Sequence, residues 1–372
     1  MNLHPRVQAA LALPMIHHRT PEFDRILARV LVRLKNIFQT QEAVFISTST
    51  GSGGMEALLV NTLAAGDRVL GIDSGKFGER WCEMVETFGG RLDRLKVAWG
   101  QAVSVAAVEK HLQQYPDTKI VLCQACETSS GIVHPIQELG NLIHSYPETL
   151  FLVDGITALG AMPLPMDLYH IDGLVGGSQK AFMLPTGLSL FSFSKKAWKK
   201  IENNPTPRYY FDVRREKKAN EKGETFFSSN VTLIRALDVV LDLIEERGLK
   251  SLFKDIEQRA IFTRQFAQKM GLKLFADKPS SSLTALTVPV TIDSQKIRQA
   301  LESKHQITIM GGQDQAKGKI LRIGHMGFIQ PKQMIDLMMK LGETLHAEDP
   351  ELCAPALMAK LELEMRQFWE KA

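Results

Sequence analysis

Two short apolar runs near the middle of the chain each end in a residue with a chemically active side chain. Phe151–Val153 is followed by Asp154, and Gly173–Gly177 is followed by Ser178, Gln179 and Lys180. Each run has the length of one buried strand, and a strand that only filled a core would not need these polar ends. In an open α/β sheet, ligands bind outside the carboxyl ends of the strands. The pattern therefore predicts an α/β fold with Asp154 and Lys180 at the ligand-binding edge.

A carboxylate and an amine at such an edge fit one kind of cofactor chemistry. A lysine can form a Schiff base with pyridoxal phosphate, and an aspartate can pair with the pyridinium nitrogen. The alternatives are that Asp154 caps a helix and that Lys180 is a solvated loop residue. The small residues Gly176, Gly177 and Ser178 would let a ligand approach the backbone closely, which favours the cofactor interpretation for the pair.

The length and charge of the chain limit the number of domains and the kinds of partner that can be expected. With 372 residues the chain is too long for one typical domain, so two domains are expected. The 45 basic residues nearly balance the 41 acidic ones, which gives no reason to expect a nucleic acid or an anionic membrane as a partner. No apolar run approaches the length of a membrane-spanning helix, so a soluble, unexported protein is expected.

The four cysteines, Cys82, Cys123, Cys126 and Cys353, are too few and too scattered for a disulfide framework. This usage fits a reducing cytoplasm. Cys123 and Cys126 have the spacing of a metal or redox pair, but no second pair completes a zinc site. We interpret them as core residues at a strand end and expect no metal.

A turn rich in glycine and hydroxyl residues separates a strand predicted at 43–47 from a helix predicted to begin at Gly54. The turn reads Thr48-Ser49-Thr50-Gly51-Ser52-Gly53. A turn of this kind before a helix presents free backbone N–H groups and the positive end of the helix dipole to an anion. It has neither the Gly-Lys-Ser/Thr of a Walker loop nor the glycine spacing of a dinucleotide fingerprint. The segment therefore predicts a phosphate cradle.

Two other predicted strands, 67–73 and 119–122, are also followed by candidate residues. Phe77 stands between glycines in a predicted loop with no obvious core to fill, although packing alone is an alternative. Ser129 belongs to the run Glu127-Thr128-Ser129-Ser130-Gly131, whose hydroxyls are also common turn residues.

Two polar segments precede a long amphipathic helix predicted at 232–247. The basic run 214–218 is interpreted as a solvated loop, with an interaction patch as the alternative. Residues 223–230 form a polar and aromatic loop that contains Ser228.

From about Gly248 the pattern changes, and the predicted elements are a helix at 255–270, a strand at 283–290, a helix at 294–304 and a strand at 306–309. This order predicts a second, smaller α+β unit. Arg322 stands inside an otherwise apolar strand, and its guanidinium needs an anionic partner. That partner is either a bound carboxylate or the acid of a buried ion pair.

Several separated motifs together resemble the class V aminotransferases, especially the alanine-glyoxylate and serine-pyruvate branch. The motifs are Val153-Asp154-Gly155, Gly177-Ser178-Gln179-Lys180-Ala181 and Pro185-Thr186-Gly187, and the resemblance extends from about Pro14 to about Phe328. It implies pyridoxal phosphate fold type I, with a mainly parallel seven-stranded sheet flanked by helices and a smaller α+β C-terminal domain. The expected domains are 15–247 and 248–372, the latter with 1–14 attached as one option.

The resemblance also implies a role for each candidate residue. Lys180 and Asp154 would be catalytic, and Arg322 would hold the α-carboxylate of the substrate. The residues implied to bind the cofactor are Ser52, Gly53, Gly54, Phe77, Ser129, Asp154, Gln179, Lys180 and Ser228. Among these, Phe77 would stack on the ring, and Ser228 would reach the phosphate of the neighbouring subunit in a homodimer with active sites at its interface.

The expected activity is amino transfer from a small amino acid, alanine or serine, to a small keto acid, glyoxylate or pyruvate. One alternative is a class V lyase or cysteine desulfurase, which needs a mobile nucleophilic cysteine, and Cys353 lies beyond the region where one is expected. The other is a catalytically silent accessory protein that binds the cofactor, although such a protein would need neither Lys180 nor Arg322.

Overall fold

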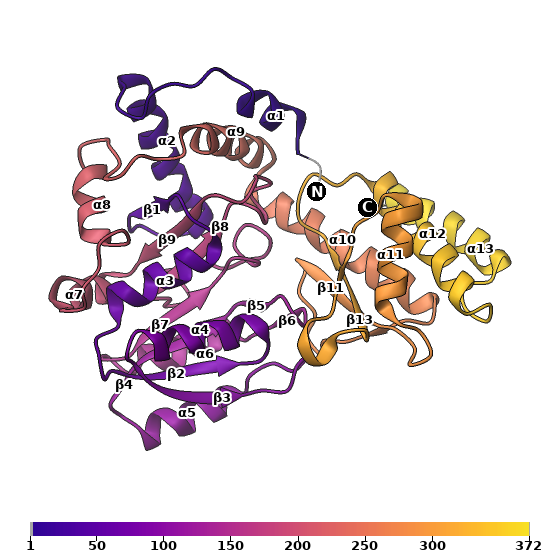
Figure 1. The fold of residues 1–372 in the computed structure, drawn as a ribbon, viewed down its shortest axis with the longest axis horizontal. Helices are drawn as coiled ribbons and strands as arrows, with labels where there is room; N and C mark the ends of the chain where they lie inside the picture. Colours follow the sequence, from indigo (N-terminus) through magenta and orange to yellow (C-terminus); the bar gives the residue numbers. More distant parts are fainter. Residues whose placement is uncertain (1–2, 372) are drawn as a thin grey trace.

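A seven-stranded sheet forms the centre of the computed structural model, which describes residues 3–371 (Figure 1). Its strands, in spatial order, are β1 (Val44–Ser47), β9 (Ser189–Phe193), β8 (Gly173–Gly177), β7 (Leu150–Asp154), β4 (Thr118–Gln124), β2 (Arg68–Asp73) and β3 (Arg91–Lys96). Neighbours pair in parallel from β8 to β3, whereas β9 is antiparallel to both β8 and β1. The predicted mainly parallel sheet is confirmed.

Strand β7 shows why these residues form a buried central strand. All five of its residues are buried, and successive side chains point to opposite faces of the sheet. Leu150 and Leu152 join the core cluster on one face, and Phe151 and Val153 join the cluster on the other. A continuous apolar run is therefore required, because helices cover both faces.

Two layers of helices cover the sheet. The layer that shares the core of Leu150 and Leu152 contains α3 (Gly51–Thr62), α4 (Lys76–Thr87), α7 (Lys195–Asn203) and α8 (Val213–Asn220). The layer on the opposite face contains α2 (Pro21–Phe38), α5 (Val105–Gln114), α6 (Ile136–His144) and α9 (Val231–Arg247). A two-stranded sheet, β5 (Cys126–Glu127) with β6 (Ile132–Val133), follows β4.

A second, smaller sheet forms after the long helix α10 (Leu249–Lys269). It is antiparallel, with the order β10 (Lys273–Leu274), β11 (Leu283–Thr287), β13 (Ile320–Gly324) and β12 (Met310–Gly311). The other elements of this region are α11 (Ser294–His305), η1 (Asp314–Ala316), α12 (Pro331–Glu348) and α13 (Pro355–Glu370). The helices pack over the sheet in a core of their own. The smaller α+β unit is therefore present.

The predictions of a strand at 306–309 and of a loop at 214–218 were wrong. The expected strand at 306–309 is absent because Gln306 adopts a left-handed conformation (φ 56°) that ends α11, and pairing with β13 begins only at Met310. The basic run 214–218 lies in helix α8 rather than in a loop. Asp212 caps this helix by accepting a hydrogen bond from the Arg214 backbone N–H, so the local polar residues favour a helix start.

The N-terminal segment packs on the larger part of the molecule. Helix α1 (Pro5–Leu11) lies along α9, where Arg6 forms an ion pair with Glu246 at 2.7 Å (Figure 1). Arg235 of α9 donates to the carbonyls of Leu13 and Pro14. The domain boundaries 15–247 and 248–372 stay predictions.

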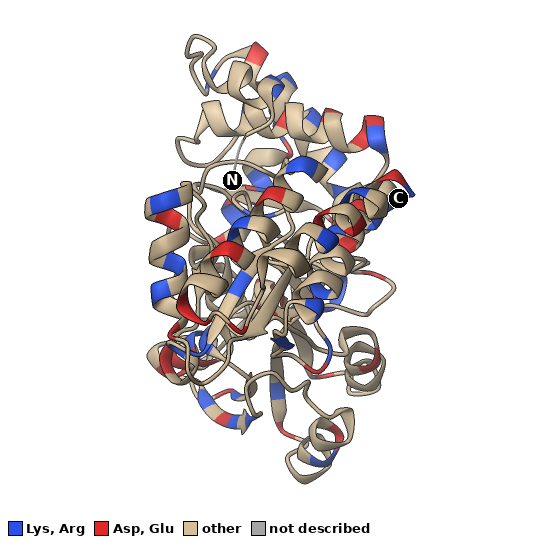
Figure 2. Cartoon of the chain, turned by 90° about the vertical axis from the view of Figure 1, so that its right-hand side faces the viewer, with Lys and Arg blue, Asp and Glu red and all other residues tan. Residues whose placement is uncertain are grey.

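Charged residues of both signs are interspersed over the side of the molecule shown in Figure 2. Within residues 3–371, no helix is both long enough and apolar enough to cross a membrane.

Candidate active site

The carboxyl ends of β7 and β8 bring Asp154 and Lys180 to the same edge of the larger sheet. Asp154 is the last residue of β7 and lies opposite Val175 of β8, five residues before Lys180. The Asp154 side chain is buried, and Lys180 is half-buried. The two side chains are close enough to interact, because the negative charge of Asp154 opposes part of the effect of burial, which lowers the pKa of Lys180.

Asp154 combines deep burial with one short hydrogen bond. Its Oδ1 accepts from the backbone N–H of Ile156 at 2.8 Å, which starts a turn rather than a helix. Burial raises the pKa of Asp154 to about 7, because the charged form is poorly solvated there. A cation bound beside this carboxyl would restore its charge, as a protonated ring nitrogen does.

Lys180 lies in a loop that is fixed at both ends. Ser178 Oγ donates to the Pro185 carbonyl at 2.7 Å and accepts from the Leu188 N–H at 3.1 Å. Burial lowers the pKa of Lys180, and the nearby charge of Arg322 lowers it further. A lowered pKa leaves more of the amine neutral, which is the form that acts as a nucleophile or a base.

Helix α3 begins at Gly51, three residues earlier than predicted, so Ser52, Gly53 and Gly54 all lie in its first turn. Thr50 caps the helix by accepting from the Gly53 N–H at 3.4 Å. Gly54 is packed against β8, because a Cβ at this position would lie 2.5 Å from Val175 Cγ2. The start of α3 and its dipole therefore lie beside the strand that leads to Lys180.

A buried carboxylate that the sequence analysis did not single out organises the start of helix α4. Glu127 Oε2 accepts from the N–H groups of Phe77 and Gly78, and Oε1 accepts from the N–H and hydroxyl of Ser129. Gly75 is required for this approach, because a Cβ there would lie 2.6 Å from Glu127 Cγ. A glutamate directly after a strand gave no sequence signal that it would be fully buried.

The positions of Phe77 and Ser129 follow from this network. Phe77 lies in the first turn of α4, not in a loop as predicted, because the helix starts at Lys76. Ser129 is fully buried, and its Oγ donates to Glu127 and accepts from the Lys76 N–H at 3.0 Å. The hydroxyl of Ser129 thus links the start of α4 to Glu127.

Arg322 is held by backbone carbonyls. Its Nε donates to Gly311 at 2.9 Å and its Nη1 to Thr128 at 2.8 Å, so β13 contacts the segment after β4. No carboxylate oxygen of residues 3–371 lies within 4.0 Å of the guanidinium nitrogens. The alternative of a structural ion pair therefore has no partner in the described part of the chain.

The side chain of Gln179 gives a further observation that fits a phosphorylated cofactor at this edge of the sheet. Gln179 Oε1 is buried without a hydrogen-bond partner among the described residues, folded back toward Gly177. An unpaired buried polar atom is costly, so a bound group that paired with it would stabilise the site. Because rotation of the amide exchanges its oxygen and nitrogen, this position can also donate to a phosphate.

Ser228 lies on the outer rim, away from these groups. It is exposed, and its Oγ is 3.4 Å from Nε2 of His18. The loop is attached to the segment before α3 by a hydrogen bond from the Asn230 N–H to Thr48 Oγ1 at 3.1 Å. In a single chain, the structure therefore does not bring Ser228 into the group around Lys180.

The cysteines are all buried, and their thiols are free. Cys123 and Cys126 belong to the core, which confirms their interpretation as packing residues. Cys353 lies between α12 and α13, where burial raises the pKa of its thiol to about 11. A thiol in this environment is unsuited to act as a mobile nucleophile.

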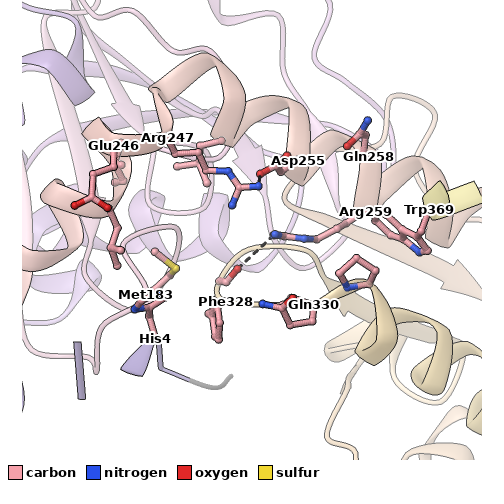
Figure 3. Close-up of a pocket in the computed structure, with 16 residues that line it drawn as sticks. His4, Met183, Glu246, Arg247, Asp255, Gln258, Arg259, Phe328, Gln330 and Trp369 are labelled. Atoms are coloured by element: carbon pink, nitrogen blue, oxygen red, sulfur yellow. Dashed lines mark hydrogen bonds and ion pairs between the residues drawn. The ribbon is translucent and has the colours of Figure 1, made fainter. Parts of the chain in front are cut away.

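A separate cavity of about 440 Å³ lies where α9 meets α10 (Figure 3). Its Arg259 donates to the carbonyls of His325 at 2.9 Å and Gly327 at 3.3 Å, and Arg247 pairs with Asp255. Arg259 thus anchors the chain directly after β13, the strand that carries Arg322.

Solved structures that align with this chain over most of its length are pyridoxal phosphate enzymes of fold type I, and the chain shares that fold. The alanine-glyoxylate aminotransferase of Nostoc sp. aligns with a TM-score of 0.89 and 26% sequence identity, over 92% of this chain and 93% of the other. The family model described as "Aminotransferase class-V" matches residues 6–333, and the chain belongs to this family.

Two relatives show the same assignment at the level of sequence. An uncharacterized aminotransferase of Methanocaldococcus jannaschii is 37% identical over 335 residues, which cover 89% of this chain and 87% of the relative. The L-aspartate–glyoxylate aminotransferase of Paracoccus denitrificans is 33% identical over 334 residues, covering 88% and 84%. The protein is therefore a pyridoxal phosphate-dependent transaminase.

Proposed function

We propose that this transaminase moves the amino group of a small amino acid, alanine or serine, to a small keto acid, glyoxylate or pyruvate. The observation that carries the proposal is the guanidinium of Arg322, which lies near Lys180 and, within residues 3–371, has only backbone carbonyls as partners. The α-carboxylate shared by amino acids and keto acids supplies the missing anion, and a guanidinium binds it in bidentate fashion. Relatives that use glyoxylate support the choice of acceptor.

Pyridoxal phosphate, when bound, supplies an aldehyde that takes the amino group and a ring that accepts the electrons released at the substrate α-carbon. Nζ of Lys180 is the base that moves the α-proton, because its lowered pKa makes the neutral amine available. Asp154 holds the proton on the ring nitrogen. Arg322 orients the α-carbon toward Nζ by fixing the carboxylate.

The same proposal gives each remaining residue a binding role. The first turn of α3, from Ser52 to Gly54, and Gln179 would hold the phosphate. Phe77 would cover one face of the ring, and Ser129 would bind the ring oxygen. Glu127 keeps Phe77 and Ser129 in place, as its four hydrogen bonds indicate.

We also propose a homodimer in which Ser228 contacts the phosphate bound to the partner chain. Support comes from aromatic side chains that surround Ser228 and are exposed in the single chain. Tyr210 is 44% exposed and Phe226 is 38% exposed, and both contact Phe227. Burial of this aromatic cluster in a subunit interface would stabilise a dimer.

The alternatives have less support. Burial raises the pKa of all four thiols, which disfavours the desulfurase reaction. A silent accessory protein does not require Lys180 and Arg322 to lie close together. The four free cysteines support the expectation of a reducing compartment such as the cytoplasm.

A panel of amino donors against glyoxylate and pyruvate, with wild type and Arg322→Lys, tests the proposed reaction. The lysine keeps the charge but loses the planar fork, so we expect KM for the amino acid to rise and kcat to fall, with kcat/KM lower by about 10- to 100-fold. Cofactor absorbance should be unchanged.

An equally active Arg322→Lys enzyme would show that the carboxylate is bound elsewhere. Loss of the cofactor or of the fold would instead identify Arg322 as a structural residue. Arg208→Lys is the matched control, because the Arg208 guanidinium also bonds backbone carbonyls, those of Ile201, Asn204 and Thr206, outside the proposed site.

A further inference from the structure

Arg80 connects two parts of the site that lie on different helices. It is located one turn after Phe77 on α4, and its Nη1 donates to Ser52 Oγ in the first turn of α3 at 3.0 Å. Its guanidinium carbon is 5.0 Å from the centroid of the Phe77 ring, within range of a cation–π contact. Arg80 therefore contacts both the proposed phosphate cradle and the proposed ring cover.

The charge of Arg80 is not neutralised by a neighbouring acid. No carboxylate oxygen within residues 3–371 lies within 4.0 Å of its guanidinium nitrogens. The adjacent Glu79 is directed to Lys76, with an Nζ to Oε2 distance of 2.8 Å. A half-buried guanidinium without an acid is costly unless an anion compensates its charge.

The position of this charge matters because the start of α3 already favours an anion. The helix dipole and the N–H groups of its first turn attract a phosphate, and Arg80 adds a full positive charge at the same place. Its charge also acts inside the site, where it opposes a small part of the effect of burial, which raises the pKa of Asp154. Oε1 of Gln179, which is buried without a hydrogen-bond partner among the described residues, separately indicates that a polar group binds here.

We propose that Arg80 is a cofactor-binding residue that supplies the positive charge of the phosphate cradle and holds the Ser52 hydroxyl in it. This inference rests on the proposed placement of the phosphate at the start of α3. It does not depend on which amino acid or keto acid is the substrate. A phosphate dianion gains a charge-assisted contact from Arg80, whereas a cofactor without phosphate gains none.

The test compares pyridoxal phosphate with pyridoxal. Holoenzyme is prepared as wild type, Arg80→Gln and Lys76→Gln, and the release of cofactor on dilution is followed by absorbance. Dissociation constants for both compounds are then measured by titration of the full-length chain after the cofactor has been removed. Circular dichroism of each variant verifies the fold.

We expect Arg80→Gln to raise Kd for pyridoxal phosphate at least about tenfold, the size expected for a lost charge-assisted contact. Its Kd for pyridoxal should not change. The salt dependence of pyridoxal phosphate binding should become weaker, because one cation near the phosphate is lost. Lys76→Gln also removes one positive charge from the first turn of α4, but this charge is paired with Glu79 and Asp314. The Kd values of this variant should therefore resemble those of wild type.

Two results would overturn the proposal. If the binding of both compounds were weakened equally, Arg80 would act only through the Phe77 ring. If the binding of neither were weakened, Arg80 would not interact with the phosphate. If Arg80→Gln does not fold, the proposal is tested by modifying the arginines of the cofactor-free wild type with phenylglyoxal. Inorganic phosphate should protect Arg80 from modification, as detected by mass spectrometry, and absence of protection would refute the inference.

Discussion

Burial shifts the pKa values of Asp154 and Lys180 in opposite directions. It raises the pKa of the carboxyl to about 7 and lowers that of the amine, so both groups are driven toward their neutral forms. In the proposed site, bound cofactor would offer a cation to Asp154 and a carbonyl carbon to Lys180. The proposal therefore accounts for both pKa shifts through a bound partner.

Removal of Asp154 should change the pH dependence of stability in the cofactor-free chain. The native pKa of about 7 exceeds the unfolded value of 3.8, so the native state binds the extra proton. Its contribution to stability is therefore present below the unfolded value and is lost as the pH rises toward 7. In Asp154→Asn this decline should be absent, which thermal unfolding at a series of pH values can measure. Parallel curves for wild type and variant would contradict the assigned pKa.

The start of helix α4 depends on one acid more than on its own capping residue. Gly75 offers no side chain to cap the helix, and Glu127 accepts the N–H groups of Phe77 and Gly78 instead. A residue 50 positions away in the sequence therefore fixes the start of α4 and the backbone of Phe77.

The variant Glu127→Gln should loosen this helix start. An amide has a single acceptor oxygen, so its NH₂ group would face donors that now meet a carboxylate oxygen. We expect a loss of about 1–3 kcal/mol in the free energy of unfolding, measured by chemical denaturation. Glu138→Gln, on the exposed side of α6, is the control and should be neutral. Equal stability of both variants would mean that Glu127 is protonated and already donates.

In the proposed dimer, each active site is completed by a residue of the other chain. Ser228 would contact the phosphate bound to the partner chain, and the exposed aromatic residues near it would be buried in the interface. The shared loop also links dimerisation to cofactor binding by mass action.

The variant Phe226→Glu should therefore weaken both association and cofactor retention. A charge placed in a buried aromatic interface should raise the dimer dissociation constant at least about tenfold, as is usual for a central interface residue. Light scattering over a range of concentrations measures this change, and dialysis measures cofactor loss. Leu168→Glu alters an exposed apolar residue elsewhere and should have no effect. A monomeric wild-type protein would contradict the proposal.

The sequence predicted the large sheet well because its strands are signalled locally. Asp154 and Lys180 follow continuous apolar runs of five residues or fewer, a length typical of one buried strand. The predicted helix at 294–304 agrees with the structure to within one residue.

The missed features depend on contacts that are distant in sequence. Glu127 reaches α4, and Arg80 reaches Ser52, through spatial proximity that no local pattern encodes. Phe77 was assigned to a loop because glycines flank it, yet Gly75 and Gly78 are small so that the helix can approach Glu127 and the end of β2. The short strand β12 was displaced by a left-handed Gln306, which sequence alone did not indicate.

Strand β3 forms one outer edge of the larger sheet, and an outer edge can pair with a strand of another chain. Such pairing leads to aggregation, and natural sheets oppose it with charged side chains. Four of the six residues of β3 carry charge: Arg91, Asp93, Arg94 and Lys96. Asp93 is paired with the buried Arg68 and Arg94 with Asp73, so the charges are tied to the neighbouring strand. The least apolar strand of the sheet thus protects the colloidal stability of the whole protein.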